Sequence, residues 1–171
     1  MNPAVSPAVQ DLPREIIARA VARGWMIATA ESLTGGLLVA RLVDVPGASH
    51  AVAGGTVCYS LEAKHRLLEL ESEELERTGA VTAEVALAMA DGARRAYDSQ
   101  LAIATTGVAG PGPDDRGVPA GTVHLALVGA EGLRHAREVH LDGDRDAVRA
   151  GAVEAALRML HDALADLPDQ R

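Results

Sequence analysis

The stretch "WMIATAESLTGGLLVARLVD", residues 25–44, sets the expected fold of this chain. Residues 25–32 form a mostly apolar run that ends at Ser32, which is typical of a buried strand leading into a turn. Residues 34–44 carry leucine and valine at helical spacing behind two glycines, which predicts a helix with a glycine-rich first turn. A buried strand that leads through a tight turn into a helix is the repeating unit of α/β proteins.

The rest of the chain extends this unit into a sheet with helices around it. We expect further strands within 51–60 and at 100–107, 122–129 and 133–141, of which the last two form a hairpin. We expect further helices at 13–24, 61–68, 71–79, 83–97 and 144–164. The pattern predicts a layered α/β/α domain with a mixed, mostly parallel sheet that contains one antiparallel hairpin. We expect a flexible N-terminus at 1–12 and a single domain at 13–166.

The composition is that of a globular, acidic protein. The 171 residues are 48% hydrophobic and carry a formal net charge of −8, which disfavours binding to the phosphate backbone of a nucleic acid. Phenylalanine is absent, and one tryptophan and two tyrosines are the only aromatic residues, so base-stacking platforms are not expected. No apolar run is long enough to span a bilayer, and the first residues lack the pattern of a signal peptide, so we expect none. We therefore expect a cytoplasmic protein that contacts neither nucleic acid nor membrane.

Metal and disulfide chemistry are not expected either. The single cysteine, Cys58, has no partner for an internal disulfide, and the six histidines show no metal-binding spacing. The sequence thus predicts no metal and no cofactor.

Ser32 is the first candidate for chemistry. It stands at a predicted strand end, just before Gly35 and Gly36, and ligands of α/β sheets bind beyond the carboxyl ends of strands. Backbone amides at such a turn can stabilise a serine alkoxide or an oxyanion. Two alternatives stay open: Ser32 or Thr34 is simply a helix N-cap, or the turn cradles a phosphate, although its spacing matches neither common nucleotide motif.

Lys64 is the second candidate. It is the only lysine among sixteen basic residues, the other fifteen being arginine. Arginine stays protonated near neutral pH, whereas a desolvated lysine can accept a proton. A lysine retained in such a chain is consistent with a base for a serine nucleophile. An ordinary surface residue kept by chance is the alternative.

The third candidate is the segment 107–121, which holds five glycines and three prolines. Long ordered loops in compact domains are often functional, and Thr105 and Thr106 at its start could bind a ligand. A stiffened connection at the sheet edge is the alternative. Arg145, near the start of the last predicted helix, could bind a phosphate. The pattern alone favours surface pairing of Arg145 with Asp142, Asp144 or Asp146.

Taken together, the motifs resemble the CinA C-terminal domain family. "AESLTGGLL", "DVPGAS", "GGTVCYSLEAK", "TGAV", "TTGVAGP", "GTVHLAL" and "GDRDAVR" occur in the family's order over about residues 13–160. Members of this kind are nicotinamide-nucleotide amidohydrolases, which convert nicotinamide mononucleotide to nicotinic acid mononucleotide and ammonia in pyridine nucleotide salvage. This chain is expected to be the stand-alone form, without the larger N-terminal domain of many relatives.

The resemblance implies an active site built around a serine–lysine dyad. Ser32 matches the nucleophile, Lys64 matches the base, and Tyr59 joins them at the catalytic centre. Substrate-binding positions are implied at Thr34, Gly35, Gly36, Thr106, Gly107, Gly110 and Arg145. The implied partner is a small pyridine nucleotide, and the alanine-rich helices suggest a homo-oligomer. The chain departs from the family pattern at Leu61, where asparagine is usual, and in the segment 116–121.

Two functions of other classes remain open at this stage. One is a non-catalytic, nucleotide-binding regulatory module in which the glycine-rich turns only hold phosphate. The other is an interaction protein related to competence for DNA uptake. Ammonia release separates the amidase from both.

Overall fold

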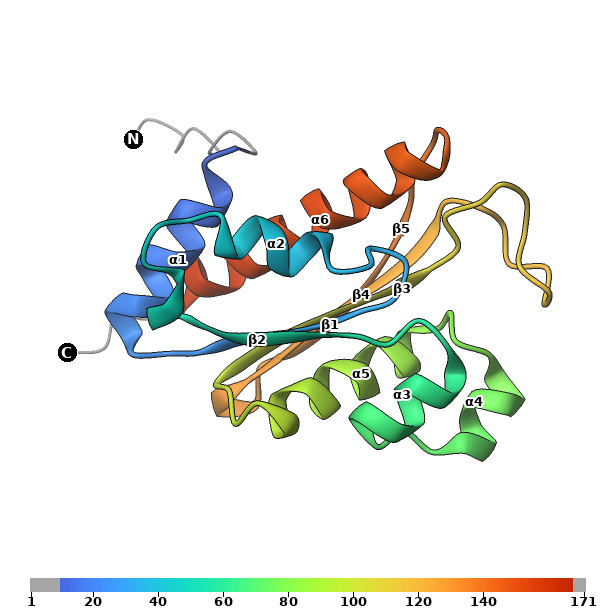
Figure 1. Cartoon of the computed structure of the whole chain (residues 1–171), viewed down its shortest axis with the longest axis horizontal. Helices are drawn as coiled ribbons and strands as arrows, with labels where there is room; N and C mark the ends of the chain where they lie inside the picture. The colour runs from blue at the N-terminus through green and yellow to red at the C-terminus, as the bar shows by residue number, and fades with distance from the viewer. Residues whose placement is uncertain (1–9, 168–171) are drawn as a thin grey trace.

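A five-stranded sheet forms the middle layer of the protein (Figure 1). The computed structural model describes residues 10–167. The sheet order is β2-β1-β3-β4-β5, with β1 at Ile27–Glu31, β2 at Val52–Val57, β3 at Leu101–Gly107, β4 at Thr122–Gly129 and β5 at Arg134–His140. Strands β2, β1 and β3 are parallel, and β4 pairs antiparallel with both β3 and β5. The predicted mixed sheet with one antiparallel hairpin is confirmed.

Helices cover both faces of the sheet, as the layered prediction requires (Figure 1). The helices are α1 (Leu12–Arg23), α2 (Leu37–Val43), α3 (Leu61–Leu68), α4 (Ser72–Thr78), α5 (Ala83–Ala96) and α6 (Arg145–Asp166). Helices α1, α2 and α6 pack on one face, and α5 packs on the other with α3 against it. Two short 3-10 turns, at Ala48–His50 and Ala130–Gly132, complete the described elements.

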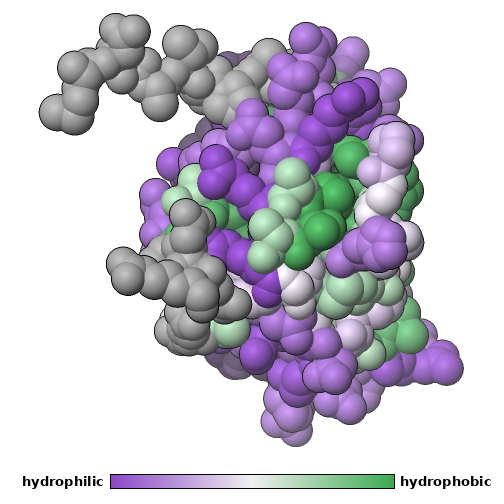
Figure 2. All heavy atoms as spheres, turned by 90° about the vertical axis from the view of Figure 1, so that its left-hand side faces the viewer, coloured by the Kyte–Doolittle hydropathy of each residue, from purple (hydrophilic) through white to green (hydrophobic). Residues whose placement is uncertain are grey.

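Side-chain size alternates along the central strands and decides how closely each helix layer approaches. Ile27, Leu101 and Ile103 point into the core under α1 and α6. Their neighbours on the opposite face are alanines, including Ala28 and Ala102, which belong to the core under α5. Because successive residues of a strand face opposite sides, small residues on one face leave room for α5 to lie close to the sheet. The outer surface is mostly hydrophilic around a limited hydrophobic area, as one side of the molecule shows (Figure 2).

The element boundaries follow the sequence prediction closely, with two differences. Helix α1 begins at Leu12, one residue before the expected start; residues 1–9 of the expected flexible N-terminus lie outside the described residues. Helix α2 begins at Leu37 rather than at residue 34. Residues 32–36 form instead a non-helical turn, in which Gly35 and Gly36 have φ angles of 60° and 93°, values that glycine adopts at no steric cost. This turn occupies the candidate site.

Candidate active site

The candidate residues meet at one edge of the sheet, where the parallel strands β1, β2 and β3 end. Ser32 directly follows β1, and Cys58 directly follows β2. Thr105 and Thr106 lie close to the end of β3. Parallel strands carry their carboxyl ends at the same edge, so segments far apart in sequence lie together here. The amide of Ser32 donates to the carbonyl of Thr105, and the amide of Cys58 donates to the carbonyl of Glu31.

Ser32 and Lys64 form a buried hydrogen-bonded pair. Lys64 Nζ lies 3.1 Å from Ser32 Oγ and 2.8 Å from the carbonyl oxygen of Cys58. The Lys64 side chain is fully buried and Ser32 is 7% exposed. Lys64 stands in the first turn of α3, whose N-cap Ser60 accepts a hydrogen bond from the Ala63 amide. The alternative of an ordinary surface lysine is therefore wrong.

The surroundings of Lys64 favour the uncharged amine. Burial lowers the pKa of Lys64 from its ordinary value of 10.5, and the nearby Cys58 opposes this shift only in part. Burial has the larger effect because the protein interior disfavours the charged form of any group. The Cys58 thiol has its own pKa raised, again chiefly by burial. A lysine that loses its proton more readily is suited to accept one from a neighbouring hydroxyl.

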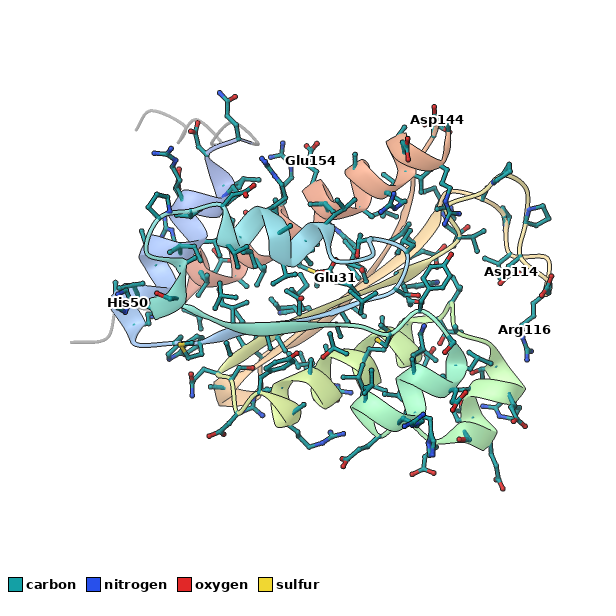
Figure 3. All side chains as sticks on the ribbon, viewed as in Figure 1. Glu31, His50, Asp114, Arg116, Asp144 and Glu154 are labelled. Carbon is teal, nitrogen blue, oxygen red and sulfur yellow. The ribbon has the colours of Figure 1, made fainter. Side chains whose placement is uncertain are left out.

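Glu31 holds the turn that follows Ser32, a role that the sequence analysis missed. Its carboxylate is fully buried and lies between α2 and the sheet (Figure 3). The carboxylate accepts hydrogen bonds from the amides of Gly36, Leu38 and Val39, at 2.8–3.0 Å, and from a threonine hydroxyl. The N-cap alternative for Ser32 and Thr34 is thereby wrong, because the side chain that caps the first amides of α2 is Glu31. An acidic residue directly before the serine was the available signal.

A small pocket opens at the same edge of the sheet, although neither Ser32 nor Lys64 lines it. It has a volume of 220 Å³ and is lined by the segment Gly107–Asp114, by Val81 and by the side chains of Tyr59 and Arg145. Tyr59 is 63% exposed, and its hydroxyl accepts a hydrogen bond from Arg145 at 3.1 Å. Arg145 also donates to the carbonyl of Gly110 at 2.8 Å. Within the described residues Arg145 has no acidic partner, so the surface pairing that the pattern favoured is not found.

Gly35 and Gly36 lie in the turn after Ser32, and the four remaining sequence-predicted positions fall into two groups. Gly107 and Gly110 line the pocket with Arg145. The hydroxyls of Thr34 and Thr106 are instead engaged by the protein itself. Thr34 Oγ1 lies 2.7 Å from Thr105 Oγ1, and Thr106 Oγ1 donates to the carbonyl of Ala80 at 2.6 Å. These two threonines fix neighbouring segments against β3. The hydroxyl of Thr106 keeps only acceptor capacity for a ligand, whereas either hydroxyl of the Thr34–Thr105 pair can be the donor.

The glycine-rich segment is anchored to the helix layer next to it. Asp114 Oδ1 accepts from the amides of Arg116 and Val118, at 3.0 and 2.8 Å. The guanidinium of Arg116 donates to the carbonyls of Glu76 and Arg77 at the end of α4. Asp114 and Arg116 stand out from the body of the sheet (Figure 3). This loop is therefore held in place by side chains as well as by its prolines.

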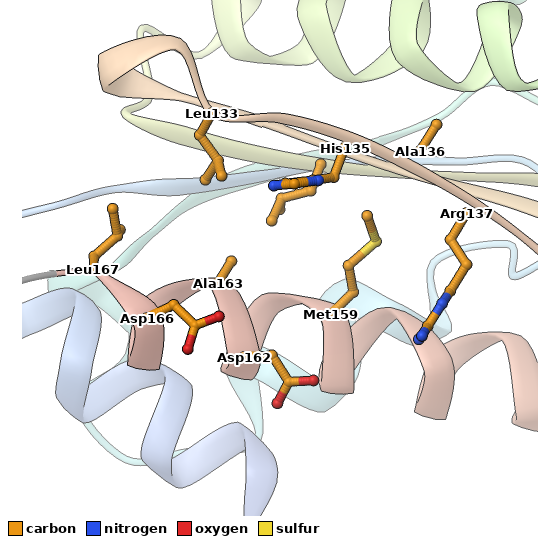
Figure 4. A pocket seen from close by; sticks show the side chains of 10 residues that line it. Leu133, His135, Ala136, Arg137, Met159, Asp162, Ala163, Asp166 and Leu167 are labelled. Carbon is orange, nitrogen blue, oxygen red and sulfur yellow. The ribbon is translucent and has the colours of Figure 1, made fainter.

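A second hollow lies away from this edge, between β5 and the end of α6 (Figure 4). Its volume is 330 Å³. His135 and Arg137 of the strand face Asp162 and Asp166 of the helix, and the other lining residues are mostly apolar. None of the residues predicted for the site lines it. Within residues 10–167 no three histidine, cysteine or acidic side chains gather in a way that could hold a metal ion. No helix in the same residues has the length and apolar character needed to cross a membrane.

These features define the chain as an α/β protein of three layers, with a buried serine–lysine pair at the carboxyl ends of its parallel strands. The particular family follows from comparison with known proteins. The family model of the CinA C-terminal domain matches residues 9–164, and the chain belongs to this family.

Relatives and solved structures agree with this assignment. A CinA-like protein of Frankia casuarinae is 46% identical over 87% of this chain and 34% of its own length. One of Anaeromyxobacter dehalogenans is 43% identical over 90% of this chain and 38% of its own length. The chain thus spans about a third of the length of the curated relatives it matches.

Crystal structures extend the similarity to the fold. The competence damage-inducible protein A of Klebsiella pneumoniae is 34% identical, with a TM-score of 0.90 over 95% of this chain and all of that one. The competence/damage inducible protein CihA of Agrobacterium tumefaciens is 38% identical, with a TM-score of 0.85 over 96% of this chain and all of that one.

Proposed function

We propose that this chain is an amidohydrolase that deamidates nicotinamide mononucleotide to nicotinic acid mononucleotide and ammonia. The observation that carries the proposal is the pair of Lys64 Nζ and Ser32 Oγ, 3.1 Å apart, in a site where burial lowers the pKa of the lysine. A hydroxyl within hydrogen-bond reach of a neutral amine is the arrangement of an activated serine nucleophile. The choice of substrate rests on the resemblance of the motifs to the deamidases of the family.

The first half of the reaction forms an acyl-enzyme. Lys64, as the neutral amine, donates one N–H to the carbonyl of Cys58 and presents its lone pair to the hydroxyl of Ser32. The lone pair takes the hydroxyl proton while Ser32 Oγ bonds to the carboxamide carbon, and the carbonyl electron pair moves onto oxygen. Protonated Lys64 then gives its proton to the amide nitrogen. The C–N bond breaks, and ammonia leaves.

The second half consumes one water molecule. Lys64, neutral again, takes a proton from water as the water oxygen bonds to the acyl carbon. The bond between that carbon and Ser32 Oγ breaks, and the serine oxygen recovers the proton from Lys64. The net change is hydrolysis of a carboxamide to a carboxylic acid and ammonia. The described residues Ser32 and Lys64 carry every proton in this sequence of steps.

We assign the nucleotide part of the substrate to the pocket that Tyr59 and Arg145 line at the same edge of the sheet. Arg145 projects into it with a permanent positive charge, and the segment Gly107–Asp114 lines it with backbone. Within the described residues the amides of Ala109 and Gly110 make no hydrogen bond to protein, so they are free to bind phosphate oxygens. Tyr59 orients Arg145 through its hydroxyl, which gives Tyr59 a supporting part in binding.

Ammonia release tests the proposal. Purified protein is incubated with nicotinamide mononucleotide, and ammonia and nicotinic acid mononucleotide are measured together. Ser32→Ala and Lys64→Met are each expected to lower kcat by at least about a thousandfold, because each removes one half of an interdependent pair. Lys64→Arg places a permanently protonated side chain at this position, which cannot act as a base, so it is expected to be equally inactive.

Ser49→Ala is the matched control, since Ser49 is exposed and lies outside the candidate site. Wild-type turnover in the Lys64→Arg variant would contradict the dyad. Binding of the nucleotide without ammonia release would support the regulatory-module alternative. An absence of both binding and turnover would favour the competence-related interaction protein.

A further inference from the structure

The turn after Ser32 has most of its backbone amides already engaged by the protein. The amide of Gly35 donates to the carbonyl of Ser32 at 3.1 Å. The amide of Gly36 donates to the carboxylate of Glu31 at 3.0 Å, and that of Leu37 donates to the carbonyl of Thr34. These amides are therefore not free to bind a substrate.

The amides of Leu33 and Thr34 differ from the rest of the turn. Neither donates a hydrogen bond to any group within residues 10–167, although Leu33 is 3% exposed and Thr34 is fully buried. Backbone N–H groups of buried residues almost always find a partner, and an unpaired one costs about 1–3 kcal/mol. Two such amides directly behind a nucleophile are the arrangement expected of donors kept for an oxyanion.

Arg149 of α6 holds the same two residues by their carbonyls. Its Nε donates to the carbonyl of Leu33 at 3.0 Å, and its terminal nitrogen donates to the carbonyl of Thr34 at 3.3 Å. The carbonyl of Leu33 and the amide of Thr34 belong to one peptide group. A cation bonded to that carbonyl both fixes the plane of the peptide and polarises its N–H, which makes the amide a stronger donor.

We propose that Arg149 is a positioning residue for the reaction. It clamps the turn so that the amides of Leu33 and Thr34 form the oxyanion hole for attack by Ser32. The inference rests on the proposed function and deepens it, since it names the groups that stabilise the charge developing on the carbonyl oxygen. Glu31 restrains the other end of the same turn through the amide of Gly36.

The contacts of Arg149 separate this role from substrate binding. All three guanidinium nitrogens have protein partners: two donate to the turn, and the third lies 3.7 Å from Asp146. The side chain is 28% exposed and does not line the pocket that holds Arg145. A guanidinium with its donors committed to backbone carbonyls fixes structure, whereas Arg145 keeps an exposed position in the pocket.

Two readouts test the proposal in the full chain. The first is kcat and KM for ammonia release from nicotinamide mononucleotide. The second is the rate at which diisopropyl fluorophosphate labels Ser32, followed by intact mass. In that reaction Lys64 takes the hydroxyl proton of Ser32, the Ser32 Oγ–phosphorus bond forms and fluoride leaves. Negative charge develops on the phosphoryl oxygen where the oxyanion would lie. Labelling therefore reports on the turn without depending on the amide substrate.

Arg149→Met is expected to lower both kcat and the labelling rate by on the order of 10- to 100-fold, because displaced donors stabilise the transition state poorly. KM is expected to stay within about twofold of wild type. Arg149→Lys, which keeps the charge but cannot bond both carbonyls in the same geometry, is expected to lie in between. Added guanidinium is expected to restore part of the rate to an Arg149→Ala variant.

Arg158→Met is the matched control, because Arg158 lies on the same helix and, among residues 10–167, pairs with Glu154 alone. An Arg149→Met protein with wild-type labelling and kcat would overturn the inference, as would a rise in KM alone. If the methionine variant does not fold, Arg149→Lys decides: labelling and kcat equal to wild type overturn the proposal, and reduced values of both with unchanged KM support it.

The failure of this inference is distinguishable from failure of the proposed function. If wild-type Ser32 is labelled but no ammonia is released, the proposed substrate is wrong, and the labelling ratio of wild type to Arg149→Met still decides the role of Arg149. If ammonia is released and the ratio is one, the function stands and the inference fails. If the wild-type protein gives neither reaction, both are overturned.

Discussion

Lys64 and Ser32 are separated by 32 residues in the chain, yet Lys64 Nζ lies 3.1 Å from Ser32 Oγ and donates a second hydrogen bond to the carbonyl of Cys58. The pair forms because β1 and β2 end at the same edge of the sheet, and α3 follows β2 after a short connection. Helix α5 packs against both α3, which carries the lysine, and β1, which leads to the serine. The same packing therefore fixes where the amine of Lys64 lies and, by burying it, lowers its pKa.

The pH dependence of turnover is expected to follow the protonation of Lys64. Only the neutral amine can accept the Ser32 proton, and burial lowers the pKa of Lys64 from 10.5. The value of kcat/KM is therefore expected to rise with pH and to level off below 10.5, with about a tenfold fall per unit on the acid side. A profile measured for the wild-type protein checks this. A rate independent of pH across the range in which the fold is stable would argue against a lysine base.

The same shift makes a prediction for stability. Because the folded-state pKa of Lys64 is lowered, the unfolded chain binds more protons than the folded one between the lowered value and 10.5. The free energy of unfolding of wild type is therefore expected to increase with pH in that window, relative to Lys64→Met, which lacks the titration. Urea denaturation of both proteins at several pH values measures the difference. A difference that stays constant, or that changes in favour of the methionine variant, would contradict the lowered pKa.

Gly92 is expected to be needed for the approach of α3 to α5. A β-carbon at Gly92 would overlap the backbone carbonyl of Leu68 and lie 2.7 Å from its β-carbon. Gly92→Ala gains about 1 kcal/mol of helix propensity, but overpacking typically costs about 1–3 kcal/mol. We expect a net loss of about 1 kcal/mol by urea denaturation, together with a lower kcat because α3 carries Lys64.

Gly151→Ala is the matched control for Gly92. Its β-carbon would meet only the flexible side chain of Leu141, at 3.2 Å or more. This variant is expected to be as stable as wild type or more stable by about 0.5 kcal/mol. Equal effects of the two substitutions would mean that the contact with Leu68 does not limit the packing.

Arg145→Met is expected to act on substrate affinity. Arg145 lines the pocket formed with Tyr59 and the segment 107–114, and a charge-assisted hydrogen bond contributes about 1.5–3 kcal/mol. KM for nicotinamide mononucleotide is expected to rise by roughly 10- to 100-fold, with kcat little changed. Nicotinamide riboside, which lacks the phosphate, serves as the control substrate. An equal loss for both substrates would show that Arg145 does not recognise phosphate.

Glu31→Gln is expected to destabilise the nucleophile turn. The amide group of glutamine replaces one oxygen that accepts backbone hydrogen bonds with a nitrogen that cannot, at a fully buried position. A loss of about 2–3 kcal/mol is expected in urea denaturation, because a buried donor is left unpaired. Glu154→Gln, which breaks a partly exposed ion pair on α6, is expected to cost less than about 1 kcal/mol. A Glu31→Gln protein as stable as the Glu154→Gln control would show that the three amides need no carboxylate.

Much of the fold could be predicted from local patterns. Periodicity and capping residues predict three parts of it. These are the strand at 25–32 with the helix behind it, the hairpin of 122–129 and 133–141, and the helix that starts after Asp144. The structure places each of them within a few residues of its expected bounds. The start of α2 was misplaced because the residue that caps it, Glu31, lies in the preceding strand, outside the usual capping positions.

The candidate site, too, could be predicted only in part from the sequence. Composition alone singled out Lys64, and the glycine-rich turns marked the segments near Ser32 and Gly107. The contacts that define their roles are long-range: Lys64 with Ser32, Arg145 with Tyr59, and Arg149 with Leu33. For Arg145 the local pattern even pointed to an acidic neighbour, which the structure does not provide within the described residues.

The sequence by itself thus determined which elements form, which family the chain resembles and which residue types can carry a proton, because these depend on spacing along one segment. The tertiary structure alone decided that the lysine is buried, that its amine meets one particular serine, and that the turn after that serine is held between Glu31 and Arg149. Burial and hydrogen-bond partners depend on which strands lie side by side and which helices cover them. No local pattern contains that information, since it is fixed only when the parallel strands bring their ends to one edge of the sheet.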